Sequence, residues 1–304
     1  MLPSRTIQIG SQSIAVYESE GSGPAALLIH GNSLSARSFQ HQLQGPLGKA
    51  FRLVAIDLPG HGNSADAQDP AAAYNLPGYA SIVAAAAEQL GLLDAAIVGW
   101  SLGGHIALEA AQLLPAARSF LIFGTPPLGI PPAMADAFLP SPAMGAAFTE
   151  HMTEEDVQAF VTGLFPTGTD IPEFFFEDVR RTDGRARAQL AISVGTVNYT
   201  DELQIVNSLS RPLAIIHGEQ EQFVNLSYIQ GLTIPTLWRG AVQLIARVAL
   251  HALWVDVPYE GTVFRVSAPV PDELTALWGA FGGDPSDWDK AQAPLANLEG
   301  ELGR

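Results

Sequence analysis

A serine with glycines close on both sides is the first candidate for chemistry in this chain. Residues 99–103 are Gly-Trp-Ser-Leu-Gly, with Ser101 at the centre. The apolar residues 95–98 precede the motif as a buried strand would, and residues 105–114 follow it as a helix that ends before Pro115. A strand, a sharp turn and a helix around G-x-S-x-G are typical of a nucleophile elbow, which exposes the serine hydroxyl at the end of the sheet. We predict that Ser101 is a nucleophile, in preference to an incidental serine in a glycine-rich connection.

A serine hydroxyl is a weak nucleophile at neutral pH, so it needs a general base and an acid that orients the base. In hydrolases with such an elbow, the acid follows a late strand and the histidine comes last in the chain. The apolar residues 212–216 predict that late strand, and Gly218-Glu219-Gln220-Glu221 comes shortly after it. Related hydrolases commonly place the acid three residues after the glycine. We therefore predict Glu221 as the acid, with Glu219 as the less favoured alternative.

The general base is predicted from its place in the chain. Only His251 follows the last predicted strand, near 241–248, so we predict His251 as the base. The alternative is that His251 has no catalytic role. The other six of the seven histidines lie in strand-end loops (His30, His61), at a strand end (His217), in the elbow helix (His105) or on predicted surface helices (His41, His151).

An oxyanion hole requires two hydrogen-bond donors beside the nucleophile. One donor is expected from the backbone N–H of Leu102, directly after Ser101. The second is expected from the loop His30-Gly31-Asn32, which follows the apolar strand 25–29, and we assign it to Asn32. Asp57, which follows another predicted strand, is interpreted as a residue that structures its own loop.

These residues need a scaffold, and the alternation of apolar strands with helices predicts an α/β fold with a mostly parallel central sheet covered on both faces. A hairpin over 5–9 and 13–18 opens the chain, and a helix over roughly 77–91 precedes the elbow strand. From 126 to 208 no convincing strand is present, which predicts an inserted helical cap with helices near 153–164, 172–181 and 185–194. We predict a core domain of 1–125 and 209–282, a cap of 126–208, and a poorly structured tail of 283–304.

The cap carries apolar side chains that could face the site and hold an acyl chain. Each of them could instead belong to the core of the cap. They are Met134, Met144, Phe148, Phe160, Phe165 and Phe174-Phe175-Phe176.

The composition of the chain bears on its possible partners, cofactors and location. The net charge of −16 disfavours binding to nucleic acid or to an anionic membrane surface, since both need a basic surface. The chain has no cysteine, and its histidines and carboxylates show no convincing metal spacing, so we expect no metal and no other cofactor. No signal peptide or membrane-spanning run is recognised, which predicts a cytoplasmic protein. Oligomeric state is not predicted.

Several motifs together resemble a known family. His30-Gly31-Asn32-Ser33, the elbow, and 57–62 (Asp-Leu-Pro-Gly-His-Gly) are similar to the α/β-hydrolase superfamily. Residues 99–105, 124–127 (Gly-Thr-Pro-Pro) and 181–187 (Arg-Thr-Asp-Gly-Arg-Ala-Arg) further resemble the α/β-hydrolase-fold N-acylhomoserine lactonases, which quench bacterial quorum signals.

The resemblance implies a metal-free enzyme with a glutamate as the triad acid, which suits Glu221. It implies substrate contacts at Asn32, Trp100 and Phe160, although Phe160 stands where these lactonases carry a hydrogen-bonding tyrosine. The family's Gly-x-Gly-His-like turn before the base is also absent, because residues 247–251 are Arg-Val-Ala-Leu-His.

The function predicted from these features is a serine hydrolase that opens the ring of N-acylhomoserine lactones through an acyl-enzyme. Its partners would then be small acyl lactones or esters. A general carboxylesterase with the same triad is the first alternative. The second is a catalytically impaired binding module, which the altered segment before His251 would explain.

Overall fold

The computed structural model describes residues 1–245 of the 304-residue chain. Eight strands of this part form one sheet in the order β1-β2-β4-β3-β5-β6-β7-β8. The predicted hairpin is β1 and β2, β2 also pairs antiparallel with β4, and the other neighbouring pairs are parallel. The predicted α/β fold with a mostly parallel sheet is thus confirmed. The strands are β1 (Arg5–Ile9), β2 (Gln12–Glu18), β3 (Ala25–Ile29), β4 (Arg52–Ile56), β5 (Ala96–Trp100), β6 (Ser119–Phe123), β7 (Leu213–Gly218) and β8 (Gln243–Ile245).

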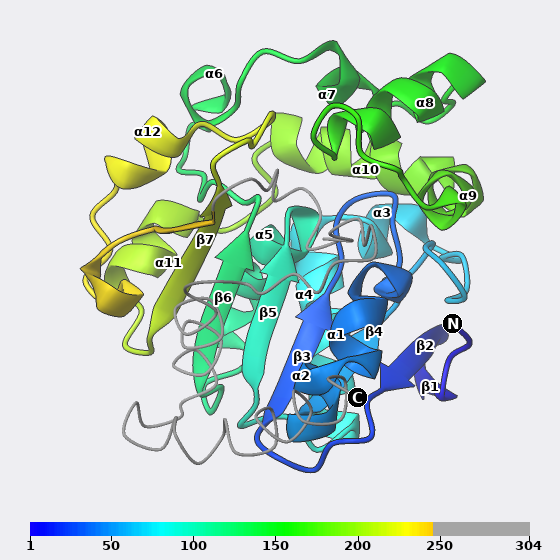
Figure 1. Cartoon of the computed structure of the whole chain (residues 1–304), viewed down its shortest axis with the longest axis vertical. Coiled ribbons are helices and arrows are strands. Elements are labelled where there is room, and N and C mark those ends of the chain that lie inside the picture. Colours follow the sequence, from blue (N-terminus) through cyan, green and yellow to red (C-terminus); the bar gives the residue numbers. More distant parts are fainter. Residues whose placement is uncertain (246–304) are drawn as a thin grey trace, which may run out of the picture.

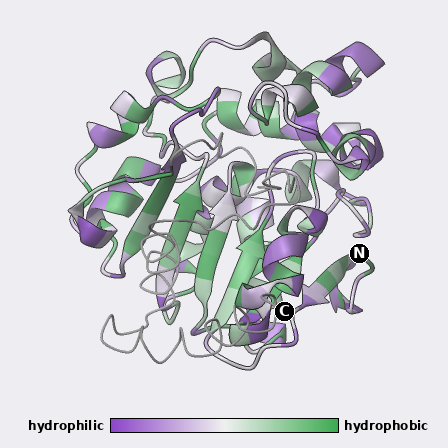
Figure 2. Cartoon of the chain, in the orientation of Figure 1, coloured by the Kyte–Doolittle hydropathy of each residue, from purple (hydrophilic) through white to green (hydrophobic). Residues whose placement is uncertain are grey.

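The central strands are apolar because helices cover both of their faces. Every residue of β5, β6 and β7 is buried, as expected for parallel strands inside a two-sided sheet. Figure 2 shows hydrophobic residues concentrated on these strands. β5 lies between β3 and β6, so the residue that follows it, Ser101, stands at the middle of the sheet.

Helices that follow the strands cover the sheet. In Figure 1, α1 (Gln40–Gln44) and α2 (Pro46–Ala50) lie in front of the strands, while α4 (Leu76–Gln89) and α5 (Leu102–Glu109) lie behind them. α4 confirms the helix predicted before the elbow strand. It begins where the Asn75 side chain accepts the N–H of Gly78, which satisfies one of the free donors of the first turn. The remaining short elements of the core are η1 (Ala36–Phe39), α3 (Pro70–Ala73), η2 (Ala110–Gln112), α12 (Leu226–Gln230) and η3 (Trp238–Gly240).

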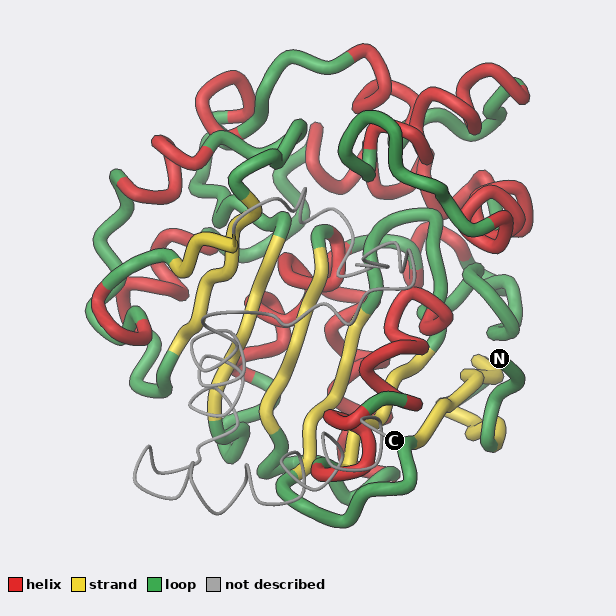
Figure 3. The backbone as a smooth tube through the Cα atoms, viewed as in Figure 1, coloured by secondary structure: helices red, strands yellow, loops and turns green. Residues whose placement is uncertain are grey.

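Residues 126–208, which we call the cap, join β6 to β7 through helices and contain no strand. The three helices predicted in the cap are confirmed as α8, α9 and α10. The cap lies over the carboxyl ends of the parallel strands, which is where loops of such sheets carry their sites (Figures 1 and 3). Its helices are α6 (Met134–Ala137), α7 (Pro142–Ala146), α8 (Glu154–Gly163), α9 (Glu173–Arg181), α10 (Gly184–Gly195) and α11 (Glu202–Ser208).

Within residues 1–245, no helix combines the length and the apolar character needed to cross a membrane.

Candidate active site

Ser101 lies between β5 and α5 in a backbone conformation that few residues adopt. Its φ is 52° and its ψ is −118°, and its N–H donates to the carbonyl oxygen of Phe123 at 2.9 Å. The hydroxyl of Thr125 lies 2.9 Å from the Ser101 carbonyl oxygen and 3.0 Å from that of Phe123. Thr125 belongs to the 124–127 motif, which follows the neighbouring strand β6. Its hydroxyl therefore stabilises the elbow by hydrogen bonding.

The glycines of the elbow are required by close packing. A Cβ added at Gly99 would overlap the backbone of Gly103, and one added at Gly103 would overlap the carbonyl oxygen of Ile29. Both obstacles are main chain, which cannot rotate away as a flexible side chain can. The turn therefore admits only glycine at these two positions.

The loop after β3 lies directly against the elbow. A Cβ added at Gly31 would stand 3.4 Å from the Cβ of Ser101. Among the hydrogen bonds within residues 1–245, neither Asn32 N–H nor Leu102 N–H donates to a protein acceptor. Leu102 is also the first residue of α5, where a helix leaves its N–H groups without intrahelical partners. Both predicted oxyanion donors are thus unoccupied beside Ser101, and their catalytic role stays a prediction.

His30 fixes the shape of this loop. Its Nε2 accepts the N–H of Leu58 at 3.0 Å, and its Nδ1 lies 2.8 Å from the carbonyl oxygen of Gly31. These partners require a neutral ring that carries its proton on Nδ1. Burial lowers the pKa of His30 to about 4, because the imidazolium would lose its hydration, so the neutral form holds the loop at neutral pH.

The side chain of Asn32 connects the same loop to the cap. Its amide nitrogen donates to the carbonyl oxygen of Ala147 at 2.7 Å, and the Ser33 hydroxyl donates to its Oδ1 at 3.2 Å. The buried guanidinium of Arg187 donates in turn to Ser33 Oγ at 3.3 Å and to the carbonyl oxygen of Thr149 at 2.8 Å. Cap residues therefore hold the loop that carries Asn32, the predicted second oxyanion donor.

A pocket with about 810 Å³ of space, part of it open to solvent, extends from Ser101 under the cap. Asn32, Trp100 and Phe160, the three predicted substrate contacts, all line it. Of the apolar cap residues singled out above, Met134, Met144, Phe148 and Phe160 face this pocket.

The other aromatic cap residues do not face it. Phe165 and Phe175 are buried and pack edge to face with ring centroids 4.9 Å apart, and Phe174 stacks on Phe175. For these residues the second of the two alternatives holds, because they pack in the core of the cap.

Glu221 follows β7, as the predicted acid of the triad should. Its Oε1 accepts the N–H of Phe223 at 2.8 Å, and its own N–H donates to the carbonyl oxygen of Gly218 at 3.1 Å. Glu219 has an exposed side chain and is tied to β8 only through its backbone, whose N–H donates to Ile245. The choice of Glu221 stays a prediction. The predicted base, His251, lies outside the described residues.

The pocket also contains an ionisable pair that sequence analysis missed. Glu202 is fully buried, and its two carboxylate oxygens lie 2.9 and 3.0 Å from Nδ1 of His105. One oxygen also accepts the N–H of Leu128 at 2.6 Å. Both His105 and Glu202 line the pocket, although His105 was interpreted only as an elbow-helix residue. The two partners of Glu202 lie 97 and 74 positions away, so no local pattern could reveal the pair.

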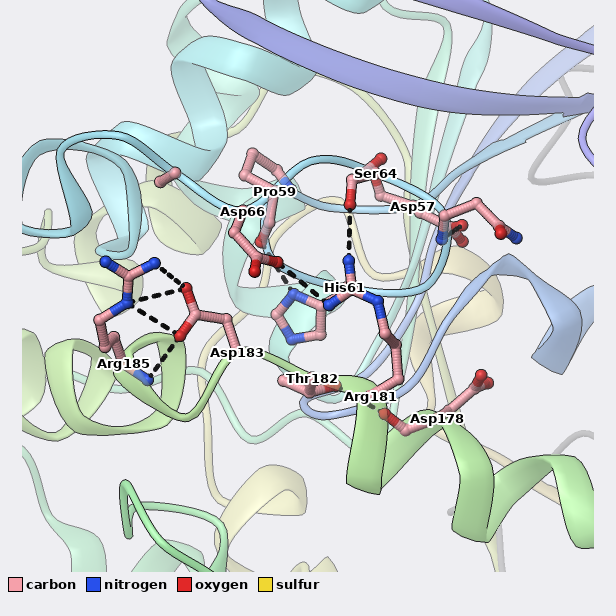
Figure 4. A network of polar contacts seen from close by, with 12 residues as sticks. Asp57, Pro59, His61, Ser64, Asp66, Asp178, Arg181, Thr182, Asp183 and Arg185 are labelled. Atoms are coloured by element: carbon pink, nitrogen blue, oxygen red, sulfur yellow. Dashed lines mark hydrogen bonds and ion pairs between the residues drawn. The ribbon is translucent and has the colours of Figure 1, made fainter.

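A second polar network joins the 181–187 segment of the cap to the core loop that follows β4 (Figure 4). Arg181 contacts Asp66 at 3.0 Å and the carbonyl oxygen of Ser64 at 3.1 Å. The N–H of Asp183 donates to Gly60 O at 2.9 Å. The core loop itself is held by Asp57, whose carboxylate accepts the N–H groups of Ala36 and Asn63 and the hydroxyl of Tyr17. The structural role predicted for Asp57 is confirmed.

Residues 1–245 contain no group of three or more His, Cys, Asp or Glu side chains placed to hold a metal ion.

Comparison with known proteins places this geometry in a family. The family model described as "Alpha/beta hydrolase family" matches residues 26–296. A pimeloyl-[acyl-carrier protein] methyl ester esterase of Stenotrophomonas maltophilia (strain R551-3) is 38% identical over 275 residues, which cover 88% of this chain and 98% of that protein.

Solved structures give a second, independent comparison. AidH, an N-acyl homoserine lactonase, was crystallised with N-butanoyl homoserine; it is 35% identical with a TM-score of 0.80, covering 91% of this chain and 95% of that one. A serine-to-glycine variant of AidH with bound N-hexanoyl homoserine lactone is 37% identical with a TM-score of 0.77, covering 80% and 88%. With its elbow, its mostly parallel sheet and these relatives, the chain belongs to the alpha/beta hydrolase family.

Proposed function

We propose that this protein opens the lactone ring of N-acylhomoserine lactones. The broader activity is established by family and relatives: the chain is a hydrolase that acts on ester bonds. A lactone is a cyclic ester, so the proposal narrows the substrate without changing the chemistry. The observation that carries it is the pocket under the cap, which begins at Ser101 and is lined mainly by apolar side chains that suit an acyl chain.

The proposed reaction follows from the groups around Ser101. Its Oγ attacks the ring carbonyl carbon, and the N–H groups of Leu102 and Asn32 bind the resulting oxyanion. The general base, assigned to His251, takes the hydroxyl proton and returns it to the ring oxygen as the C–O bond breaks. The opened homoserine remains attached to Ser101 as an ester. Water activated by the same base then releases N-acyl homoserine.

Two further observations support lactonase activity. AidH is named as an N-acyl homoserine lactonase, and its likeness covers nine-tenths of this chain. In addition, Asn32 and Phe160 approach the pocket from the core and from the cap, so a substrate in the pocket would touch both parts of the protein.

The test is the rate of ring opening for butanoyl to dodecanoyl homoserine lactones, followed by acid release at constant pH. We expect kcat/KM to rise with chain length, by up to about fourfold for each fully buried methylene, since burial of a methylene contributes ~0.8 kcal/mol. Ser101→Ala should reduce turnover by at least about 10³-fold, whereas Ser81→Ala, on the outside of α4, should not.

Methyl esters and p-nitrophenyl esters of the same acids form the comparison series. If they are hydrolysed far faster than every lactone, the protein is better described as a carboxylesterase. A flat dependence on chain length would mean that the pocket does not hold the acyl chain. Full activity of Ser101→Ala would remove the serine mechanism itself.

A further inference from the structure

His105 carries an unused hydrogen-bonding group at the pocket. Three other polar side chains that line the pocket, those of Asn32, Tyr199 and Glu202, already have partners. The Asn32 amide nitrogen bonds Ala147, the Tyr199 hydroxyl donates to Gly129 O at 3.0 Å, and Glu202 accepts from His105 and Leu128. Nδ1 of His105 is held by Glu202. Within residues 1–245, its Nε2 has no hydrogen-bond partner.

The position of His105 relative to the nucleophile follows from the helix. His105 is four residues after Ser101, and its N–H donates to the Ser101 carbonyl oxygen at 3.3 Å. Four residues of a helix advance about 6 Å along its axis, so the imidazole stands about one turn from the reacting serine. In an N-acylhomoserine lactone the ring carbonyl carbon that Ser101 attacks and C3 of the acyl chain are five bonds apart, which is a similar distance, so C3 would lie within reach of this ring.

The surroundings make an unsatisfied Nε2 costly once substrate excludes water. Most of the pocket lining is apolar, as with the neighbouring Leu128 and Val194. A buried polar atom left without a partner costs free energy, whereas a matching group on the substrate removes that cost. The site therefore favours a substrate with a polar group at this depth over one with an unbroken alkyl chain.

We propose that His105, positioned by Glu202, recognises a hydroxyl group near the carbonyl end of the acyl chain, so that 3-hydroxyacyl substrates are preferred. The Nδ1 proton of His105 is committed to the carboxylate, so the neutral ring offers Nε2 as an acceptor and the imidazolium offers it as a donor. A hydroxyl satisfies either form because it both donates and accepts. A keto oxygen can only accept, which suits the imidazolium alone.

The proposal rests on the proposed function for its lactone substrates, but ester hydrolysis alone is enough to test it. The experiment measures kcat/KM for unsubstituted, 3-hydroxy and 3-keto octanoyl groups, each as the homoserine lactone and as the p-nitrophenyl ester of the N-acylglycine, which keeps the same number of bonds between the attacked carbonyl and C3. The wild-type protein should prefer the 3-hydroxy over the unsubstituted chain by about fivefold, the effect of one net hydrogen bond. In His105→Phe, which keeps a ring but has no nitrogen, this preference should disappear. His151→Phe, at a fully exposed histidine, should retain it.

Glu202→Gln separates recognition from a purely structural role. Its amide keeps an oxygen for the N–H of Leu128, but its NH₂ group would donate to Nδ1 of His105. The imidazole proton then moves to Nε2, which becomes a donor in the neutral ring. The ratio of 3-keto to 3-hydroxy kcat/KM should therefore rise by about fivefold.

The outcomes are distinguishable. Equal losses on all three acyl groups in His105→Phe, together with an unchanged keto-to-hydroxy ratio in Glu202→Gln, would overturn the proposal and leave the pair only a structural link. If His105→Phe does not fold, the ratio in Glu202→Gln decides. If esters are hydrolysed but no lactone is opened, the proposed function fails, while the ester series still tests His105.

Discussion

At the scale of single residues, Ser101 combines backbone strain with exposure to the pocket. Its φ of 52° and ψ of −118° lie in a region that costs a residue with a side chain about 1–3 kcal/mol. The bonds to Phe123 and Thr125 hold the turn from the adjacent strand. The strain is therefore supported by main-chain and hydroxyl contacts that belong to the sheet rather than to the substrate. This leaves the Ser101 hydroxyl free for chemistry.

The identity of the acid can be tested at two neighbouring positions. Glu221→Gln keeps an oxygen for the N–H of Phe223 but removes the charge that would stabilise an imidazolium, so kcat should fall by about 10³-fold or more. Glu219→Gln is the matched control, because the Glu219 side chain is exposed, and its kcat should be nearly unchanged. The reverse result would show that the acid of the site has been assigned to the wrong position.

Phe160 offers a test of substrate contact. It lies on α8 with 5% of its surface exposed and lines the pocket, where a hydroxyl at its ring tip could meet the substrate amide. Phe160→Tyr should raise kcat/KM for lactones by about two- to tenfold, the effect of one added hydrogen bond. Phe138→Tyr, at another lining residue, is the control. A lower rate in Phe160→Tyr, with KM raised, would mean that the ring contacts only the alkyl chain.

At the scale of elements, the cap is held on the core by polar contacts as well as by apolar packing. The buried Arg187 on α10 donates to the carbonyl oxygens of Thr149 and Glu150 and to Ser33 of the oxyanion loop. Burial lowers the pKa of Arg187 through desolvation. One side chain thus connects two parts of the cap with the loop that carries Asn32.

Two arginines of the 181–187 segment give a matched comparison. Arg187→Met removes the donors of buried carbonyl groups and should lower the free energy of unfolding by about 2–4 kcal/mol, with a loss of kcat from the loosened loop. Arg185→Met removes an ion pair between a half-exposed guanidinium and the largely buried carboxylate of Asp183, and no buried carbonyl loses its donor, so it should lower the urea midpoint less than Arg187→Met does. Similar midpoints for the two variants would contradict the role assigned to Arg187.

At the scale of the whole molecule, buried ionisable groups predict how stability depends on pH. Burial lowers the pKa of His30 to about 4 and that of His61 to about 3, whereas both titrate near 6.5 when unfolded. The unfolded state therefore binds more protons below pH 6.5, and stability is lost as the pH falls from that value. Two such histidines would lower the free energy of unfolding by about 2.7 kcal/mol for each pH unit.

Protonation of Asp178 raises the stability of the folded state as the pH falls, which is opposite to the effect of the two histidines. Burial raises its pKa to about 6, despite its bonds to Ser35 and Arg37, so the folded state takes up a proton as the pH falls through 6. This stabilises the folded state between about pH 6 and 4 and offsets one histidine. Burial raises the pKa of Asp57 as well, which acts in the same sense. The net loss of stability should therefore be nearer 1.4 kcal/mol per pH unit, or less.

Urea denaturation between pH 6 and 5 tests this balance. In Asp178→Asn the offsetting group is gone, so the loss of unfolding free energy per pH unit should become about 1.4 kcal/mol steeper. Asp94→Asn, at an exposed aspartate, should leave the slope as it is. An unchanged slope in Asp178→Asn would show that Asp178 does not titrate in this range.

Local sequence determined much of this protein, because strands, elbows and cap helices are set by patterns of a few neighbouring residues. The apolar run before Gly99, the glycines around Ser101 and the absence of a strand in 126–208 predict a central strand, a sharp turn and a run of helices, and the structure agrees on these elements. Only tertiary structure decided which side chains share the pocket. Glu202 meets His105 and Leu128 across long sequence separations, and Phe175 turns into the cap core while Phe160 turns toward Ser101. The physical reason is that periodicity marks a residue as buried, but the docking of one element on another determines what it is buried against.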